Sequence, residues 1–326
     1  MTDRHKILVT GAAGYVGAVL CRQLLTAGFA VRGLDRLLFG GASLVELAPS
    51  DHFEFVKGDL RDATRVTRCL GDVHAVVHLA AIVGDPACQK FPEEASEVMD
   101  TATVDLYQQC QAAGVKHFVF ASTTSNYGVM EGEQLLVENA PLNPQSHYAR
   151  LKVGFERYLL DHPVPGMAAT ILRFATAYGF SPRVRFDLSV NHFTRDLSLG
   201  RELLIFGEKL WRPYCHVRDL ARSVVKVLEA GPGPMHSKVY NVGDSQENYT
   251  KEMIVRAISE IAPQGKVKYG TGPAADVRNY RVDFSRIQRE LNFTLTRRVP
   301  EGIRELNRLV TSGLIADPDA TIYRNT

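Results

Sequence analysis

Two side chains in the middle of the chain, Tyr148 and Lys152, are suited to acid–base chemistry. They are four positions apart, so in a helix they would lie on one face, one turn from each other. A phenol is a poor base at neutral pH because its pKa is about 10. A neighbouring ammonium favours the phenolate and lowers that pKa, so we expect Tyr148 to carry a proton and Lys152 to assist it.

A glycine-rich segment near the start, residues 10–17 (TGAAGYVG), has the composition of a phosphate cradle. It follows a short apolar run at 6–9, typical of a buried parallel strand, and precedes a helical pattern that should end at Gly28. Glycines at such a turn let backbone amides approach a pyrophosphate, and the positive end of the helix dipole stabilises it. The segment predicts a dinucleotide site, although its G-x-x-G-x-x-G spacing differs from the common G-x-G-x-x-G fingerprint.

The acidic residue after the next strand indicates which dinucleotide is bound. Residues 29–34 form the expected second strand, and Asp35 lies at its carboxyl end. A carboxylate there hydrogen-bonds the adenosine ribose hydroxyls and repels a 2′-phosphate, which favours NAD over NADP. Arg36 follows directly and could meet a phosphate, so the alternative stays open at this point. A dinucleotide site followed by the tyrosine and lysine indicates hydride chemistry.

Apolar runs and helical patterns alternate through the first half of the chain. Strands are expected within 53–60, 75–81 and 117–122, and the longest helical pattern spans 93–113. Such alternation predicts an α/β fold, a doubly wound parallel Rossmann sheet. Ligands of such sheets bind at the carboxyl ends of the strands, where the glycine-rich turn and Asp35 lie.

These motifs, in this order, resemble the extended branch of the short-chain dehydrogenase/reductase superfamily. Within that branch they resemble the nucleotide-sugar epimerases, dehydratases and reductases, with the 4-epimerases most similar in motif pattern. The matching segments cover nearly the whole chain and lie at 10–17, 58–60 (GDL), 78–81 (HLAA), 122–128 (STTSNYG), 148–152 (YxxxK), 173–179, 212–219 (RPYCHVRD) and 240–243 (YNVG).

The resemblance implies roles for residues that spacing alone does not assign. Thr123 matches the residue that hydrogen-bonds the reacting sugar oxygen, and it completes a catalytic set with Tyr148 and Lys152. Lys152 would also hold the nicotinamide ribose. The expected NAD contacts are Gly11, Gly14, Tyr15, Val16, Gly17, Asp35, Arg36, Asp59, Leu60, Leu79, Ala80, Ala81, Tyr148 and Lys152.

On the substrate side, Arg212 matches an arginine that grips the diphosphate of a nucleotide sugar. A planar cation with several donors suits that task, and the competing interpretation is an ordinary surface charge. Arg278 lies in a late segment that would close over the nucleotide. Val83, in a loop that also contains Cys88, would reach the sugar, although a plain turn is an equal alternative. Further substrate contacts are expected at Thr124 and at Thr176, where many relatives have Asn.

The positions after Thr123 bear on the reaction. Dehydratases of this kind carry an Asp-Glu pair there, whereas this chain has Thr124 and Ser125, which disfavours dehydration. We therefore expect an NAD-dependent nucleotide-sugar 4-epimerase, which oxidises its substrate to a 4-keto sugar and reduces it again on the opposite face. The alternatives are an NAD(P)H-dependent 4-keto-sugar reductase and a non-catalytic dinucleotide-binding regulator.

The resemblance also implies two interleaved domains and a homodimer. The NAD-binding Rossmann domain would comprise 1–173 plus 213–242, and a smaller C-terminal substrate lobe 174–212 plus 243–326. The active site would lie in the cleft between them. The dimer would form through helices at about 147–160 and 93–113, as in similar enzymes.

Composition excludes several classes of partner. The net charge is +2, from 38 basic and 36 acidic residues, with no dense basic stretch, which argues against nucleic acid. There is no apolar run of about 18 residues, so no membrane span is expected, and the opening strand leaves no room for a secretory signal. The five cysteines are scattered and lack metal-ligand spacing, which favours reduced thiols, a cytoplasmic location and no metal.

Overall fold

The computed structural model describes residues 4–129, 134–235, 237–271 and 276–325. Its centre is a seven-stranded sheet in the order β10-β6-β5-β4-β1-β2-β3, in which every neighbouring pair is parallel. This confirms the doubly wound sheet predicted from the alternation of strands and helices. Its strands are β1 (Lys6–Thr10), β2 (Ala30–Asp35), β3 (Phe53–Lys57), β4 (Ala75–His78), β5 (His117–Thr123), β6 (Ala168–Phe174) and β10 (Lys238–Val242).

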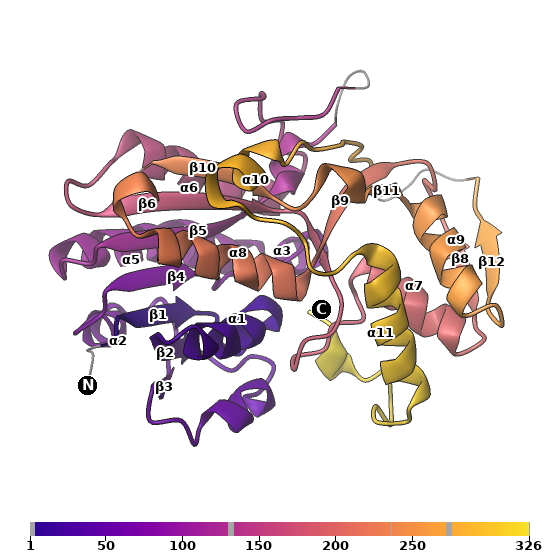
Figure 1. Cartoon of the computed structure of the whole chain (residues 1–326), viewed down its shortest axis with the longest axis horizontal. Coiled ribbons are helices and arrows are strands. Elements are labelled where there is room, and N and C mark those ends of the chain that lie inside the picture. Colours follow the sequence, from indigo (N-terminus) through magenta and orange to yellow (C-terminus); the bar gives the residue numbers. More distant parts are fainter. Residues whose placement is uncertain (1–3, 130–133, 236, 272–275, 326) are drawn as a thin grey trace.

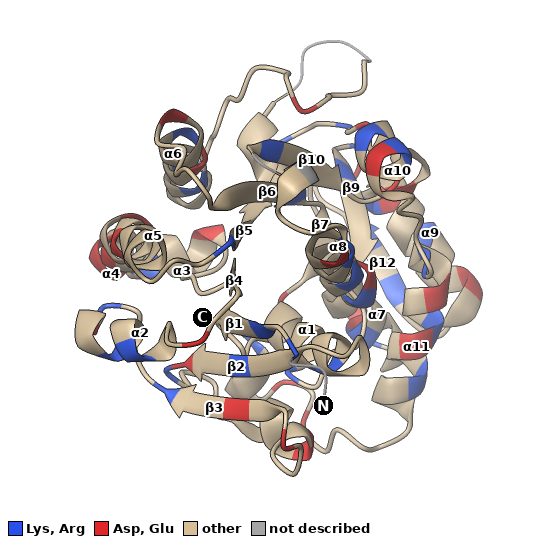
Figure 2. Ribbon diagram, turned by 60° about the vertical axis from the view of Figure 1, so that its left-hand side comes forward, with Lys and Arg blue, Asp and Glu red and all other residues tan. Residues whose placement is uncertain are grey.

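Helices cover both faces of this sheet, and Figure 2 separates them clearly. Apolar side chains of α1 and α8 form one core against the sheet, and those of α2, α5 and α6 form a second core on the other face. β4 and β5 contain no Asp, Glu, Lys or Arg, as expected for central strands buried on both faces. The helices are α1 (Tyr15–Thr26), α2 (Ala63–Cys69), α5 (Ala102–Ala112), α6 (His147–Asp161), α8 (Val217–Ala230) and α10 (Ser285–Leu291).

A smaller lobe lies beside the carboxyl ends of the central strands, on the right in Figure 1. The chain leaves the central sheet after β6 and returns to it for β10. The exact boundaries of the two interleaved domains, as given above from the sequence, stay a prediction. The lobe has its own apolar core. It contains α7 (Ser189–Ser198), α9 (Lys251–Ile261), α11 (Val299–Thr311), a sheet of β7 (Thr176–Tyr178), β9 (Trp211–His216) and β11 (Asn248–Thr250), and a pair of β8 (Glu202–Ile205) and β12 (Lys266–Tyr269).

The helix expected at 93–113 is confirmed as one continuous helical stretch, made of α4 (Pro92–Ser96), a π-helical turn (Glu97–Thr101) and α5. At the π-helical turn the Thr103 hydroxyl donates to the Val98 carbonyl at 2.8 Å and competes with the backbone ladder. One local prediction differs from the structure. The segment that contains Cys88 is a short helix, α3 (Asp85–Lys90), which Pro86 favours at its start. Short 3₁₀ turns span Ala42–Leu47, Thr124–Tyr127, Gly233–Met235, Ser245–Glu247 and Thr321–Tyr323.

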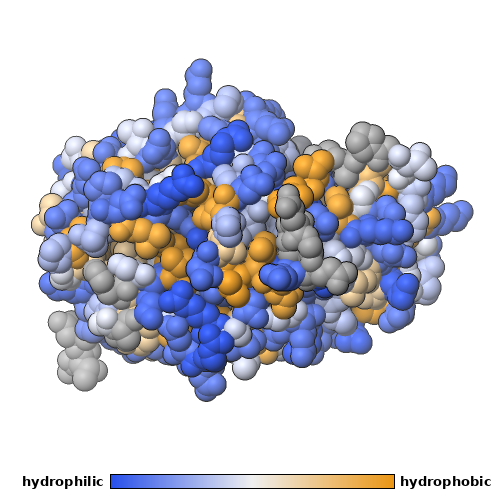
Figure 3. All heavy atoms as spheres, turned by 90° about the horizontal axis from the view of Figure 1, so that it is seen from above, coloured by the Kyte–Doolittle hydropathy of each residue, from blue (hydrophilic) through white to orange (hydrophobic). Residues whose placement is uncertain are grey.

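The surface in Figure 3 is mostly hydrophilic, with apolar residues in separated groups. Among the helices that the structure describes, none combines the length and apolar character needed to cross a bilayer. The five cysteines are buried free thiols.

Candidate active site

The glycine-rich turn between β1 and α1 brings the backbone close to the cavity. Gly11 has φ +73°, a conformation that favours glycine, and a Cβ there would lie 2.9 Å from the Ala80 backbone nitrogen. A Cβ at Gly17 would lie 2.1 Å from the Gly11 carbonyl oxygen. Only glycine fits both positions. The first turn of α1 is therefore open to an anion, as the pyrophosphate of NAD requires.

Backbone amides fix the position of Asp35, the acidic residue at the end of β2 that is expected to bind the ribose. Asp35 accepts hydrogen bonds from the Ala13 amide at 3.0 Å and the Leu37 amide at 2.7 Å, and burial raises its pKa. Arg36, which could have met a 2′-phosphate, instead pairs with Glu94 at 2.5 Å and Asp59 at 3.5 Å. Because its charge is already compensated, the structure favours an unphosphorylated ribose at this position.

One continuous cavity of about 880 Å³ runs from this point to α6 and the smaller lobe. Every residue predicted to contact NAD lines this cavity. These residues are Gly11, Gly14, Tyr15, Val16, Gly17, Asp35, Arg36, Asp59, Leu60, Leu79, Ala80, Ala81, Tyr148 and Lys152. The glycine turn, Asp35 and the shared lining together fit the cofactor.

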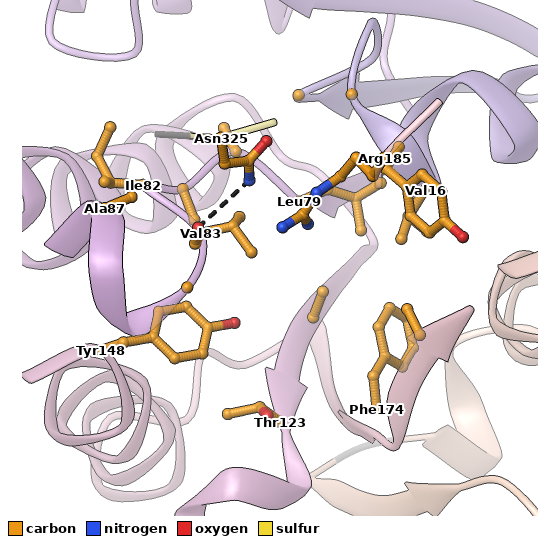
Figure 4. A pocket seen from close by; sticks show the side chains of 18 of the residues that line it. Val16, Leu79, Ile82, Val83, Ala87, Thr123, Tyr148, Phe174, Arg185 and Asn325 are labelled. Atoms are coloured by element: carbon orange, nitrogen blue, oxygen red, sulfur yellow. Dashed lines mark hydrogen bonds between the residues drawn. The ribbon is translucent and has the colours of Figure 1, made fainter. Parts of the chain in front are cut away.

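The three predicted catalytic side chains, Thr123, Tyr148 and Lys152, line the same cavity. Ser146 caps α6 by accepting from the Ala149 amide at 3.2 Å, which fixes the helix that presents Tyr148 and Lys152. Figure 4 shows Tyr148 and Thr123 pointing into the same cavity. The two side chains come from different elements, Tyr148 from α6 and Thr123 from the end of β5.

Lys152 is buried close to Tyr148. Its Nζ donates to the Ala121 carbonyl at 2.8 Å and lies 5.8 Å from the centre of the Tyr148 ring. Burial lowers the pKa of Lys152 to about 8, and burial raises the pKa of Tyr148 well above its ordinary value. Burial is the largest influence on the Tyr148 pKa among the protein groups, so a lowering of that pKa by Lys152 and the positively charged nicotinamide together stays a prediction.

A buried carboxylate behind Lys152 was missed by the sequence reasoning. Glu156 lies one further turn along α6 and pairs with Arg173 at 2.7 Å. It also accepts from Asn126 at 2.8 Å and from the Ser122 hydroxyl. Its four-residue spacing from Lys152 was the available signal. The network fixes the end of β5 next to Thr123.

The substrate side is an arginine pair around one aspartate. Arg212 and Arg278 each lie 2.8 Å from Asp276, and Arg278 also pairs with Asp85 at 2.9 Å. Burial opposes the ionisation of Asp276, but the two arginines lower its pKa. Arg212 is 8% exposed and lines the cavity, which argues against an ordinary surface charge.

Of the other expected substrate contacts, Val83 and Thr176 line the cavity, whereas Thr124 does not. The 3₁₀ turn that follows β5 buries Thr124, with its hydroxyl 3.4 Å from that of Tyr280, and exposes Ser125 to the cavity instead. His216 accepts from the Arg218 amide and pairs with Glu305, as a structural hydrogen-bonder. The described residues include no group of three His, Cys, Asp or Glu side chains placed to hold a metal.

A model of the NAD dependent epimerase/dehydratase family matches residues 7–243. The chain belongs to the NAD-dependent epimerase/dehydratase family. NAD is therefore its cofactor, in agreement with the glycine turn and Asp35.

Relatives within the family differ in reaction. The chain is 31% identical over 299 residues to a dTDP-glucose 4,6-dehydratase of Streptomyces griseus, with 88% of each chain covered. It is 30% identical over 304 residues to a UDP-glucose 4-epimerase of Mycolicibacterium smegmatis, covering 91% of this chain and 96% of that one. A solved dTDP-glucose 4,6-dehydratase from Streptomyces venezuelae, with NAD bound, superposes with a TM-score of 0.84 at 27% identity, covering 94% and 97%.

This family member also has cavity residues that the motifs did not indicate. Arg183 and Arg185 come from the segment between β7 and α7, and Asn325 comes from the end of the chain. No motif marks them, because they reach the cavity through the packing of distant segments.

Proposed function

We propose that this chain is an NAD-dependent nucleotide-sugar 4-epimerase. The observation that carries the proposal is the state of the carboxylates lining the cavity. Asp35 accepts two backbone amides, and each of the others pairs with arginine. Those pairs are Asp59 with Arg36 and Arg61, Asp85 with Arg278, Glu94 with Arg36 and Arg61, Asp187 with Arg185, and Asp276 with Arg212 and Arg278.

Dehydration needs an acid and a base to expel water from the sugar. The positions that would supply them, Thr124 and Ser125, carry hydroxyls, and the cavity carboxylates are engaged. Oxidation and re-reduction of a hydroxyl at one carbon need only the tyrosine and the threonine of the cavity, with NAD bound. This supports epimerisation over dehydration, although relatives of both kinds are similar to the chain.

The proposed reaction begins with the C4 hydroxyl hydrogen-bonded to Tyr148 and Thr123. Bound NAD supplies the group that accepts and returns the C4 hydride. Tyr148 takes the hydroxyl proton as C4 is oxidised, and Thr123 holds the oxygen while it becomes a carbonyl. The sugar then turns, Tyr148 returns the proton to the oxygen, and the hydrogen at C4 is restored on the opposite face.

The diphosphate of the substrate is placed by the paired arginines. Arg212 and Arg278 present planar donors at the cavity wall, and their shared Asp276 fixes their orientation. Anchoring at the diphosphate leaves the sugar free to rotate about its link to the nucleotide. That rotation is what epimerisation through a keto sugar needs.

Product analysis by NMR tests this proposal. The purified protein is incubated with a panel of nucleotide sugars and no added cofactor, and an interconversion at C4 that proceeds to equilibrium supports it. Turnover of a 4-keto sugar only when reduced cofactor is supplied would instead establish a reductase. If the protein shows no turnover in either assay but still binds NAD, it would be a non-catalytic dinucleotide-binding protein.

The proposal includes a homodimer and a cytoplasmic location. The dimer would pack through α5 and α6, whose exposed residues include Asp105, Gln108, Arg150 and Arg157. An interface with these side chains would weaken as salt is raised. Light scattering at low and high salt measures the mass, and a monomer in both would contradict this part. The five buried thiols support a reducing compartment.

A further inference from the structure

Arg183 is a buried arginine at the wall of the cavity, and no described carboxylate lies within ion-pair distance of it. It is 6% exposed. Its Nη2 donates to the Arg324 carbonyl at 2.9 Å and its Nη1 to the Val184 carbonyl at 3.4 Å, while its Nε has no hydrogen-bond partner among the described residues. Its guanidinium lies 4.0 Å from the centre of the Phe39 ring.

A buried cation without a counter-charge is costly, so this arrangement calls for an anionic ligand. Burial lowers the pKa of Arg183 to about 10, and the nearby charge of Arg185 acts in the same direction. Asp187 is the opposing charge, but its carboxylate already pairs with Arg185 at 2.7 Å. An anion entering the cavity would relieve the excess positive charge.

Contacts place Arg183 and Arg185 beside the first turn of α1. The Ser181 hydroxyl donates to the Tyr15 carbonyl at 2.7 Å, and the Tyr15 hydroxyl donates to the Gly179 carbonyl at 2.6 Å. The Arg185 guanidinium lies 6.0 Å from the centre of the Tyr15 ring. In Figure 4 this guanidinium points into the cavity. Both arginines therefore lie where the glycine turn leaves room for a pyrophosphate.

The end of the chain holds this arginine segment in place. Besides the Arg324 carbonyl, which accepts from Arg183, the Tyr323 carbonyl accepts from the Phe186 amide at 2.8 Å. The Asn325 amide donates to Asp187 at 3.2 Å, and its side chain donates to the Val83 carbonyl at 3.3 Å. Val83 follows β4 of the central sheet, so the tail connects the two parts of the molecule across the cavity. Figure 1 shows the C-terminus between them.

We propose that Arg183, with Arg185 beside it, binds the pyrophosphate of NAD from the side opposite the glycine-rich turn. The cofactor would then be held by backbone amides of the Rossmann domain and by two cations of the smaller lobe. The tail keeps those cations in position. This contact goes beyond the proposed epimerase activity, because it would hold the cofactor equally in a reductase.

The competing ligand is the diphosphate of the substrate. Arg212 and Arg278 already form a separate pair on the lobe, organised by Asp276. Arg183 instead stacks on Phe39, which follows the β2 strand that delivers Asp35 to the ribose. Its neighbours thus belong to the cofactor half of the cavity.

The test is NAD affinity, measured by calorimetry on protein stripped of cofactor. Arg183→Gln should raise the Kd for NAD about tenfold or more, the loss expected for one charge-assisted contact. The same variant should weaken ADP-ribose binding equally and leave adenosine binding unchanged, which localises the effect to the pyrophosphate. The amount of NAD that stays bound through gel filtration should fall in parallel.

Two further variants act as controls. Arg201→Gln removes an arginine that pairs with Asp319 of the tail but does not line the cavity, and its Kd should stay within about twofold. Arg183→Lys keeps the charge without the planar fork and should give an intermediate Kd. If Arg183→Gln fails to fold, Arg183→Lys and a chain ending after Ala320 provide the same measurement, each with a raised Kd expected.

Two results would overturn the proposal. An unchanged Kd for NAD together with a raised KM for the nucleotide sugar would assign Arg183 to the substrate. If the Kd for NAD and the KM for the nucleotide sugar are both unchanged, Arg183 contributes only to packing. Since the Kd for NAD is measured without turnover, failure here is distinct from failure of the epimerase assignment.

Discussion

At the scale of single residues, burial controls the proton chemistry of the site. It disfavours the charged form of each group, so Tyr148 holds its proton more tightly and Lys152 holds its proton less tightly than in water. Thr123 does not titrate and serves as a fixed hydrogen-bonding group. The phenol therefore needs the positive charges of the filled site before it can act as a base.

Replacing Tyr148 with Phe should lower kcat by about 10²–10⁴-fold, the usual contribution of a general acid–base group. NAD binding should persist, since the ring still fills its place in the wall. Tyr158→Phe on the same helix is the matched control, because its hydroxyl accepts a hydrogen bond from Gln108 at the surface and does not line the cavity, and it should retain activity. Retained turnover in Tyr148→Phe would remove the tyrosine from the mechanism.

The lowered pKa of Lys152 predicts a specific pH dependence of stability. Between pH 8 and about 10.4 the unfolded chain binds more protons at this side chain than the folded one, so folding stability should rise with pH in that window. The gain would reach at most about 3 kcal/mol, at 1.36 kcal/mol per pKa unit. Urea unfolding of the wild type and Lys152→Met at several pH values measures it. Parallel curves for the two proteins would contradict the shifted pKa.

At the scale of elements, α6 presents three functional side chains one turn apart. Tyr148 and Lys152 face the cavity, and Glu156 ties the helix to β5 and β6 through Ser122 and Arg173. The proposed catalytic couple, Tyr148 and Lys152, is thus positioned by a buried polar network as well as by apolar packing. Such networks specify one arrangement because partial satisfaction is costly.

Glu156→Gln should be strongly destabilising, by about 3–5 kcal/mol, because it leaves the Arg173 guanidinium buried without its counter-charge. Denaturant unfolding gives the value. Glu93→Gln, at an exposed position of α4, is the control and should change stability by less than about 0.5 kcal/mol. A loss in Glu156→Gln no larger than in this control would show that the pair contributes nothing.

At the scale of the whole molecule, the sequence predicted those features that are determined by residues close together in the chain. The apolar runs, the glycine turn and the Tyr148–Lys152 spacing each act within a few residues, and the sheet and cofactor wall followed from them. The contacts of Arg183 could not be predicted, because its partner Arg324 is 141 positions away. The burial of Thr124 was missed for a related reason: its direction depends on a 3₁₀ turn that packs it against Tyr280.

In the proposed reaction, one carbon of a nucleotide sugar is oxidised and reduced again within a single site. This reaction is tested most directly with a substrate deuterated at C4, incubated with the enzyme and no added cofactor. The C4 epimer should form and should retain deuterium at C4, because the same hydride is returned. Deuterium found on another carbon of the product, or an enzyme inactive until reduced cofactor is supplied, would contradict it.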